Sequence, residues 1–126
     1  MNLATVFNVY IGEIDKEVVK CIDYNFRLLP ELNLVLITDS KINFNHENIK
    51  VLSLKDFQLR LDSMNIDSKY FFKNPYKLCD LKPYLPLIYK DLWNSASYVG
   101  WCDLDILFSR RLVASIKNAD INDQPI

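Results

Sequence analysis

Two aspartates separated by one residue, Asp103 and Asp105, are the side chains of this sequence best suited to chemistry. They follow a short apolar run, residues 98–102, which is typical of a buried strand. In an extended chain the side chains at positions i and i+2 point the same way, so the two carboxylates are predicted to lie side by side. A hard divalent cation such as Mg²⁺ or Mn²⁺ relieves their repulsion and keeps coordination positions for water and substrate phosphates. The pattern indicates a metal-assisted nucleotide or phosphate site.

The tripeptide by itself is a weak signal. The chain holds twelve aspartates, so an Asp-x-Asp pattern is expected roughly once by chance, and two solvated aspartates at a strand end are the alternative. The position of the pair favours a functional site, because an apolar strand aimed at it suits a ligand crevice at the carboxyl ends of parallel strands.

Composition excludes several classes of function. The 126 residues suit a single small domain, and half of them are apolar, enough for a packed core. The net charge of −1 gives no electrostatic basis for binding nucleic acid or an anionic membrane surface. Two glycines are too few for a glycine-rich phosphate loop. Any phosphate must therefore be bound by a metal, by Lys or Arg, or by a helix N-terminus.

Cysteine and histidine usage does not predict a zinc site. The cysteines Cys21, Cys79 and Cys102 are far apart, and the only histidine, His46, falls in a polar stretch where we expect it to be solvated. We expect reduced, mostly buried thiols in a cytoplasmic protein. The N-terminus lacks the pattern of a signal peptide, and no apolar run approaches the roughly 20 residues that a membrane span needs.

Apolar periodicity predicts strands that alternate with helices. Strands are expected at residues 3–11, 32–38, 49–54 and 97–102, helices at 13–29, 56–64, 85–92 and within 106–117, and an aromatic loop at 70–75. This alternation favours an α/β domain with a mostly parallel sheet flanked by helices. The carboxyl ends of parallel strands share one edge, where we expect Gly12, Asp39, Ser40 and the aspartate pair to meet in one crevice.

Two boxes carry a resemblance to a known family. Residues 76–83, Tyr-Lys-Leu-Cys-Asp-Leu-Lys-Pro, and residues 100–105, Gly-Trp-Cys-Asp-Leu-Asp, resemble a poorly characterised bacterial group of GT-A-type glycosyltransferases, the nucleotide-diphospho-sugar transferase superfamily. Residues 35–40 are similar to that group's second strand. The resemblance runs from the first strand to just past Asp105, and the two boxes together are fairly specific.

The resemblance implies a GT-A-like, Rossmann-like fold that binds a nucleotide-diphosphate sugar through Mn²⁺ or Mg²⁺. By matching position, Asp105 would be the main metal ligand, Asp103 would contact ribose or a metal-bound water, and Asp39 would lie near the base or ribose. A bridging metal would neutralise the charge that develops on the departing diphosphate. The implied setting is bacterial surface-polysaccharide biosynthesis, with a glycan or another molecule as acceptor.

Four further residues complete the implied nucleotide-sugar site: Tyr10, Lys77, Asp80 and Lys82. The two lysines could supply positive charge for the diphosphate. The alternative is that Asp80 and a lysine form a structural ion pair, while Tyr76 and Leu78 pack inward. We expect Trp101 to lie in the core rather than to stack on a sugar.

The sequence departs from the family pattern after the aspartate pair. Enzymes of this fold continue with an acceptor site and often a catalytic base, whereas 21 residues follow Asp105 here. We therefore expect residues 1–126 to be the donor-binding half of the fold, truncated after the Asp-x-Asp motif. An exposed sheet edge would then favour a homodimer.

Three functions compete at this stage. The first is a metal-dependent glycosyltransferase. The second is a catalytically inactive module that binds nucleotide sugar or serves as an interaction domain. The third, a phosphatase with an aspartate nucleophile, needs downstream Ser or Thr, Lys and acidic elements for which almost no chain remains.

Overall fold

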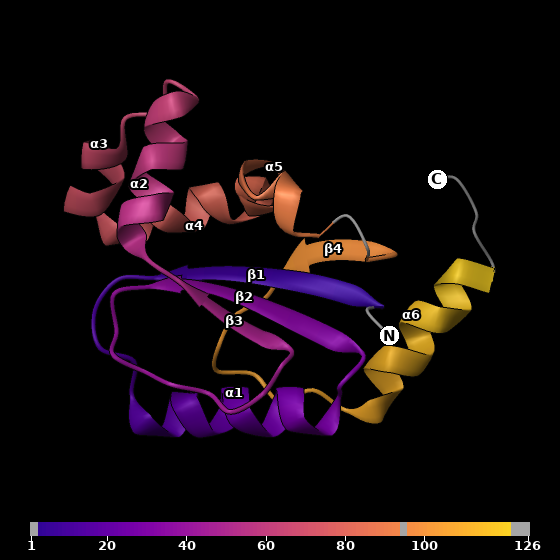
Figure 1. Ribbon diagram of the computed structural model, residues 1–126. Coiled ribbons are helices and arrows are strands. Elements are labelled where there is room, and N and C mark those ends of the chain that lie inside the picture. Colours follow the sequence, from indigo (N-terminus) through magenta and orange to yellow (C-terminus); the bar gives the residue numbers. More distant parts are fainter. Residues whose placement is uncertain (1–2, 94–95, 122–126) are drawn as a thin grey trace.

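A computed structural model describes residues 3–93 and 96–121. The strands are β1 (Ala4–Tyr10), β2 (Leu32–Thr38), β3 (Ile49–Leu52) and β4 (Tyr98–Trp101), and they form one parallel sheet in the order β3-β2-β1-β4 (Figure 1). The helices are α1 (Lys16–Leu28), α2 (Leu54–Ser63), α3 (Ser68–Lys73), α4 (Leu78–Leu81), α5 (Leu85–Ile88) and α6 (Arg110–Ile121). Short 3₁₀ helices are η1 (Pro75–Lys77), η2 (Lys82–Tyr84) and η3 (Lys90–Leu92). The predicted α/β architecture, a parallel sheet flanked by helices, is confirmed.

The strand order creates a switch point beside β1. From β1 the chain moves outward on one side to β2 and then β3, and it later returns to place β4 on the other side of β1. In sheets of this kind ligands bind in the crevice outside the carboxyl ends of the strands where the order reverses. That crevice lies between the ends of β1 and β4.

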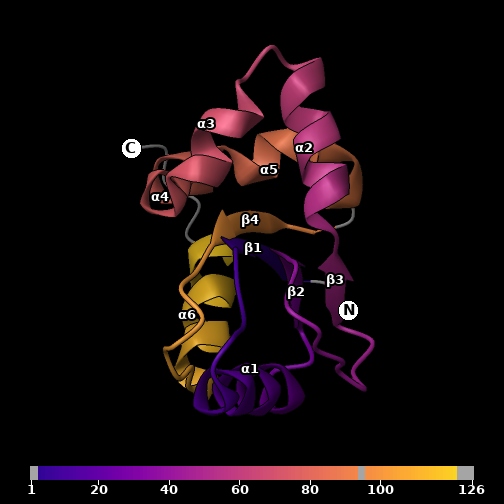
Figure 2. The same cartoon turned by 90° about the vertical axis from the view of Figure 1, so that its left-hand side faces the viewer.

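Helices cover both faces of the sheet. Figures 1 and 2 show α1 and α6 on one face and α2 to α5 on the other. The side chains of β1 alternate accordingly: Ala4 packs in the core beside α1, whereas Phe7 and Val9 pack in the core beneath α2 to α5. Because helices bury both faces, β1 and β2 consist of nearly continuous apolar sequence.

An aromatic stack fastens the α2–α5 layer to the sheet. The ring of Tyr89 lies between Phe7 and Phe57, with ring centroids 5.9 and 6.3 Å away. The Arg60 guanidinium covers the Tyr89 ring, 4.4 Å from its centroid. All three aromatic side chains are fully buried. The stack therefore joins β1, α2 and the residue that follows α5 in one packing unit.

Two predictions for residues 70–92 need correction. The expected aromatic loop at 70–75 contains most of α3, because Phe71 and Phe72 pack against the core on that side of the sheet. The expected helix over 85–92 is broken into short pieces. Pro75, Pro83 and Pro86 each stand at the start of a new helical segment, because proline fits the first turn of a helix but interrupts its interior.

The predictions of a solvated His46 and of a buried thiol for Cys79 were wrong. His46 Nε2 lies 2.6 Å from Asp23 Oδ1 on α1, since the β2–β3 loop folds back over that helix. Cys79 is exposed because its neighbours Leu78 and Leu81 occupy the buried side of α4. Cys21 is half-buried.

Arg60 also carries an ion-pair network with a defined pH dependence. It donates hydrogen bonds of 2.7 and 3.1 Å to the two oxygens of Asp91, and this holds the pKa of Asp91 below its usual value. A carboxylate whose pKa is lower in the folded state stabilises the fold above its unfolded pKa, and this stabilisation is lost as pH falls through the folded pKa.

We therefore expect Asp91→Asn to lower the free energy of unfolding at pH 7, and to matter less in acid. The loss at pH 7 should be below about 1 kcal/mol, because the side chain is largely solvated. It should shrink at a second, acidic pH below the lowered pKa of Asp91, where the wild-type carboxylate is protonated as well. Urea denaturation of both proteins at the two pH values measures this. A difference that does not change with pH would contradict the assignment.

Candidate functional site

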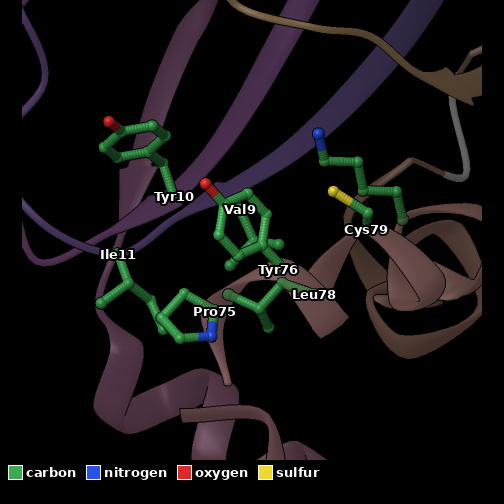
Figure 3. A pocket seen from close by; sticks show the side chains of 8 residues that line it. Val9, Tyr10, Ile11, Pro75, Tyr76, Leu78 and Cys79 are labelled. Carbon is green, nitrogen blue, oxygen red and sulfur yellow. The ribbon is translucent and has the colours of Figure 1, made fainter. Parts of the chain in front are cut away.

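A pocket of about 310 Å³ opens at the carboxyl end of β1 (Figure 3). One wall comes from the strand end and the residue after it, and the other from the helical segment η1–α4–η2. The residues that matter for its chemistry are Tyr10 and Ile11 on the strand side, and Tyr76, Leu78 and Lys82 on the helical side. The pocket lies at the β1 end of the switch-point crevice.

Two tyrosines are among the residues that line this pocket. Tyr76 is 93% exposed and Tyr10 is 42% exposed, while Leu78 is buried. Leu78 thus anchors the segment and leaves the Tyr76 ring in solvent. The inward packing considered for Leu78 is confirmed, and that considered for Tyr76 is wrong. An exposed aromatic ring at a pocket rim is suited to stacking against a base or a sugar.

Lys82 links this pocket to the aspartate pair. Its side chain is 18% exposed and lines the pocket, and Nζ donates to Asp103 Oδ1 at 3.3 Å. The Asp103 side chain is 66% exposed. The fold thereby places a sheltered cation and a solvated carboxylate together, at the crevice between β1 and β4.

The loop after β4 is fixed to β1 at its start. The Cys102 amide donates to the Phe7 carbonyl at 3.2 Å, and Asn8 Nδ2 donates to the Cys102 carbonyl. Asn8 is buried within the otherwise apolar centre of β1. Leu104, between the two aspartates, is also buried. Asp103 and Asp105 therefore flank an anchored residue.

Asn25 of α1 fixes the other end of this loop. Its Nδ2 donates to the Ile106 carbonyl at 2.7 Å, and its Oδ1 accepts from the Phe108 amide at 2.8 Å. The Phe108 ring packs edge-to-face on Phe26 with centroids 5.9 Å apart. Asn25 is 2% exposed. With both ends held, the segment from Cys102 to Phe108 is a defined platform for the two carboxylates.

Sequence reasoning missed Asn8, Asn25 and Tyr76. The sequence did hold a signal for the first two: Asn8 is a polar amide inside an apolar strand, and Asn25 is a polar amide on the apolar face of a helix. Buried amides need hydrogen-bond partners, so such positions indicate a clamp. The neighbouring sequence does not indicate the hydrogen-bond partner of either amide, because that partner lies 81 or more residues away.

Asp39 holds the β1–α1 loop at the same edge of the sheet. Its Oδ1 accepts from the Gly12 amide at 2.8 Å, and Gly12 adopts a φ of +106°, which favours glycine. Beside it, Ser40 Oγ accepts from the Ile14 amide at 3.2 Å. The prediction that residues at the strand ends meet at one edge of the sheet is thus confirmed for Gly12, Asp39 and Ser40. Asp39 and Ser40 both form hydrogen bonds with the β1–α1 loop, which contains Gly12.

The N-terminus of α1 is already capped by a carboxylate. The Asp15 side chain accepts from the Glu17 amide, and Glu17 adds a second acid to the first turn. Negative charge there satisfies the helix dipole and disfavours a bound phosphate. Phosphate binding at this edge would therefore depend on lysine or on a metal.

The carboxylate oxygens at this site suit a metal cation that binds together with a phosphate-containing ligand. Lys82 binds one oxygen of Asp103, and Asp105 is exposed with no hydrogen bond or ion pair among the described residues. Within residues 3–93 and 96–121 no three His, Cys, Asp or Glu side chains cluster as a metal cage. Mg²⁺ is commonly held by one or two carboxylates, with water and phosphate completing its shell. Asp103 and Asp105 suit that arrangement.

Cys102 is not an available nucleophile. Burial, reinforced by the Asp103 carboxylate and opposed by Lys82, raises the pKa of its thiol to about 12. The thiol is therefore neutral at physiological pH, and only the thiolate is reactive.

Lys77 and Asp80 pair with each other, outside the lining of the pocket. Lys77 Nζ lies 4.0 Å from Asp80 Oδ2, and both side chains are more than half exposed. This is the structural ion pair that was the alternative for the first box. Among the predicted site residues, the fold brings together Tyr10, Lys82 and Asp103.

Trp101 is half exposed, so its predicted place in the core was wrong. It ends β4, which is the outermost strand on that side of the sheet in the described part of the chain, so no further strand covers it. Together with Asp103 it borders a second pocket, between the sheet and α6.

Comparisons with known proteins give a family. None of the helices in the described ranges has the length and apolarity to cross a membrane. No curated protein and no solved structure matches the chain. Residues 6–122 match a family described as "Family of unknown function (DUF6625)", and the protein therefore belongs to that family.

Proposed function

We propose that this protein binds a nucleotide-diphosphate sugar in the crevice between β1 and β4, together with Mn²⁺ or Mg²⁺. The observation that carries the proposal is the pair formed by Lys82 and Asp103, 3.3 Å apart, at the switch point of a parallel sheet and beside a pocket. Ligands of Rossmann-like sheets bind at this position. The resemblance of the two sequence boxes to GT-A-type glycosyltransferases supports the same ligand.

Each side chain has a part in this binding. The exposed rings of Tyr10 and Tyr76 would stack on the base or sugar, and Lys82 would contact the diphosphate. Asp39 would keep the β1–α1 loop in place beside the ligand. Asp103 and Asp105 would hold the metal, which supplies Lewis-acid stabilisation of negative charge on a departing diphosphate.

Ligand binding then exchanges partners within the Lys82–Asp103 pair. Without ligand, the lysine neutralises the carboxylate. When a metal and a diphosphate bind together, Asp103 would gain the metal and Lys82 would gain phosphate oxygens, so no charge is left unpaired. This exchange makes the binding of metal and nucleotide mutually dependent.

The activity we propose is a metal-dependent glycosyltransferase of bacterial polysaccharide assembly. A cytoplasmic location is part of the proposal: Cys21, Cys79 and Cys102 are all free thiols, which is typical of reducing compartments. A catalytically inactive nucleotide-sugar-binding module is the second candidate. It is favoured by the position of Lys82, which already neutralises Asp103 and could bind a diphosphate without a metal. Binding without sugar transfer or hydrolysis would identify that case.

Calorimetric titration with UDP, GDP and their sugars, with and without Mn²⁺, tests the proposal. We expect metal-dependent binding that weakens at least about tenfold in Asp105→Ala, equivalent to about 1.4 kcal/mol. Asp67→Asn removes an exposed acid whose side chain does not cap its helix, and should bind like wild type. Absence of binding by a folded wild-type protein would overturn the proposal.

Lys82→Met separates the two ligands. It should weaken nucleotide binding, because a phosphate contact is lost, yet strengthen binding of Mn²⁺ alone, because Asp103 is released. Lys69→Met, an exposed lysine of α3, is the matched control. Equal loss of both affinities would contradict the exchange of partners.

A further inference from the structure

The second pocket has a volume of about 420 Å³ and lies between β1 and α6. Its helical wall comes from α6, and Figure 2 shows α6 on the opposite face of the sheet from the helices that form the first pocket. Ala4 and Val6 form its floor, Phe108 and Ile116 form its far wall, and Asp103 is its one ionisable carboxylate. The volume falls within the range of small-molecule sites.

The two pockets meet at one ion pair. Lys82 lines the first, Asp103 lines the second, and their charged atoms are 3.3 Å apart. A molecule in the second pocket with a polar group at Asp103 would therefore lie next to a ligand of the first pocket. Because Asp103 is largely exposed, its carboxylate has room to accept a hydrogen bond from such a group.

Space continues along β4 beside this pocket. A Cβ atom added to Gly100 would meet no atom within 4 Å, and the pairing partner of Gly100 on β1 is Val6, which lines the pocket. Gly100 lies two positions before Cys102, which also lines the pocket. Because side chains two positions apart in an extended chain point the same way, both residues face the same side of the sheet. Gly100 does not have a positive φ, so a larger side chain is compatible with its backbone.

We propose that the second pocket binds an amphipathic alcohol, with its apolar body between β1 and α6 and its hydroxyl at Asp103. The lining selects this class: an apolar floor and wall with a single carboxylate at the Lys82 end. The inference rests on the proposed function in one respect, namely that this alcohol is the acceptor of the sugar. In that transfer the hydroxyl oxygen bonds to the anomeric carbon, the bond from that carbon to the diphosphate breaks with its electron pair on the diphosphate, and the hydroxyl proton passes to water.

Octyl β-D-glucoside, below the concentration at which it forms micelles, is the probe. Methyl-resolved NMR of the wild-type protein should show saturable shifts at Val6, Leu112 and Ile116, and none at the exposed Leu59 of α2. Gly100→Leu, which fills the space, should weaken this binding at least tenfold. Shifts elsewhere, no saturable binding, or unchanged affinity in a folded Gly100→Leu would overturn the proposal.

Further variants separate this inference from the proposed function. Tyr76→Ala alters the first pocket, and should weaken UDP binding while leaving octyl glucoside binding unchanged. Gly100→Leu should do the reverse. If UDP does not bind but the glucoside does, and Gly100→Leu abolishes this, the apolar pocket stands and the nucleotide site fails. Should Gly100→Leu not fold, Gly100→Ala and Ile116→Phe provide smaller changes in the same space.

Discussion

Asn25→Ala should lower the free energy of unfolding by about 2–4 kcal/mol, because it removes a buried side chain that is the hydrogen-bond partner of two part-buried backbone groups. The Ile106 carbonyl loses its donor at 2.7 Å, and the Phe108 amide loses its acceptor at 2.8 Å. The side-chain amide that bridges the two groups is itself 2% exposed. The loss is large relative to the 5–15 kcal/mol that stabilises a typical domain.

The same substitution should loosen the loop that holds the aspartates. We expect metal-dependent nucleotide binding to weaken by more than the loss of folded protein explains, because Asp103 and Asp105 would no longer be held in place. Urea denaturation and titration of the folded fraction measure the two effects. Asn118→Ala, an exposed asparagine of α6, is the control and should change neither. Full stability in Asn25→Ala would show that the clamp does not hold the loop.

Asn25→Asp tests the clamp more finely. A carboxylate can still accept from the Phe108 amide, but it cannot donate to the Ile106 carbonyl. Its effect should therefore differ from that of alanine in one identifiable bond: amide hydrogen exchange at Phe108 should stay protected in the aspartate variant and become faster in the alanine variant.

Phe57→Ala should have the largest effect on stability, about 3–5 kcal/mol. The ring is fully buried and stacks between Tyr89 and Phe72, both with centroids 6.3 Å away. Its removal leaves a cavity beneath α2 and withdraws support from Tyr89, whose hydroxyl already has no hydrogen-bond partner among the described residues.

The effect of Phe57→Ala should be specific to the core. Leu59→Ala on the same helix removes a side chain that is 61% exposed, and should shift the unfolding free energy by less than about 0.5 kcal/mol. Phe57→Leu should fall between the two. Thermal and urea denaturation of the three variants measure the series. Comparable losses for Phe57→Ala and Leu59→Ala would contradict the packing described for α2.

The architecture could be predicted because buried parallel strands leave a strong local pattern. Residues 32–38 are nearly all apolar, and the predicted strand coincides with β2. The helix that precedes it also has a clear period, and Pro30 follows its end. The edge at which Asp39 and Asp103 lie then follows from the alternation of strands and helices, without knowledge of any contact.

The details of the site could not be predicted, because they depend on contacts between distant residues. Lys82 and Asp103 are 21 positions apart, and Asn25 reaches residues 81 and 83 positions away. The outward position of the Tyr76 side chain could not be predicted for another reason. It lies among short helical segments that prolines begin, where no long period assigns a side chain to one face.

The most direct test of the proposed site is paramagnetic NMR with Mn²⁺ and UDP on ¹⁵N-labelled protein. Mn²⁺ broadens the signals of nearby amides, so it reports where a metal is held without requiring any acceptor or turnover. We expect Mn²⁺ with UDP to broaden the amides of residues 102–106 together with those near Tyr10 and Lys82, and Asp105→Ala to abolish this. Broadening confined to other acids such as Asp67, or none at all, would contradict a metal-dependent nucleotide site between β1 and β4.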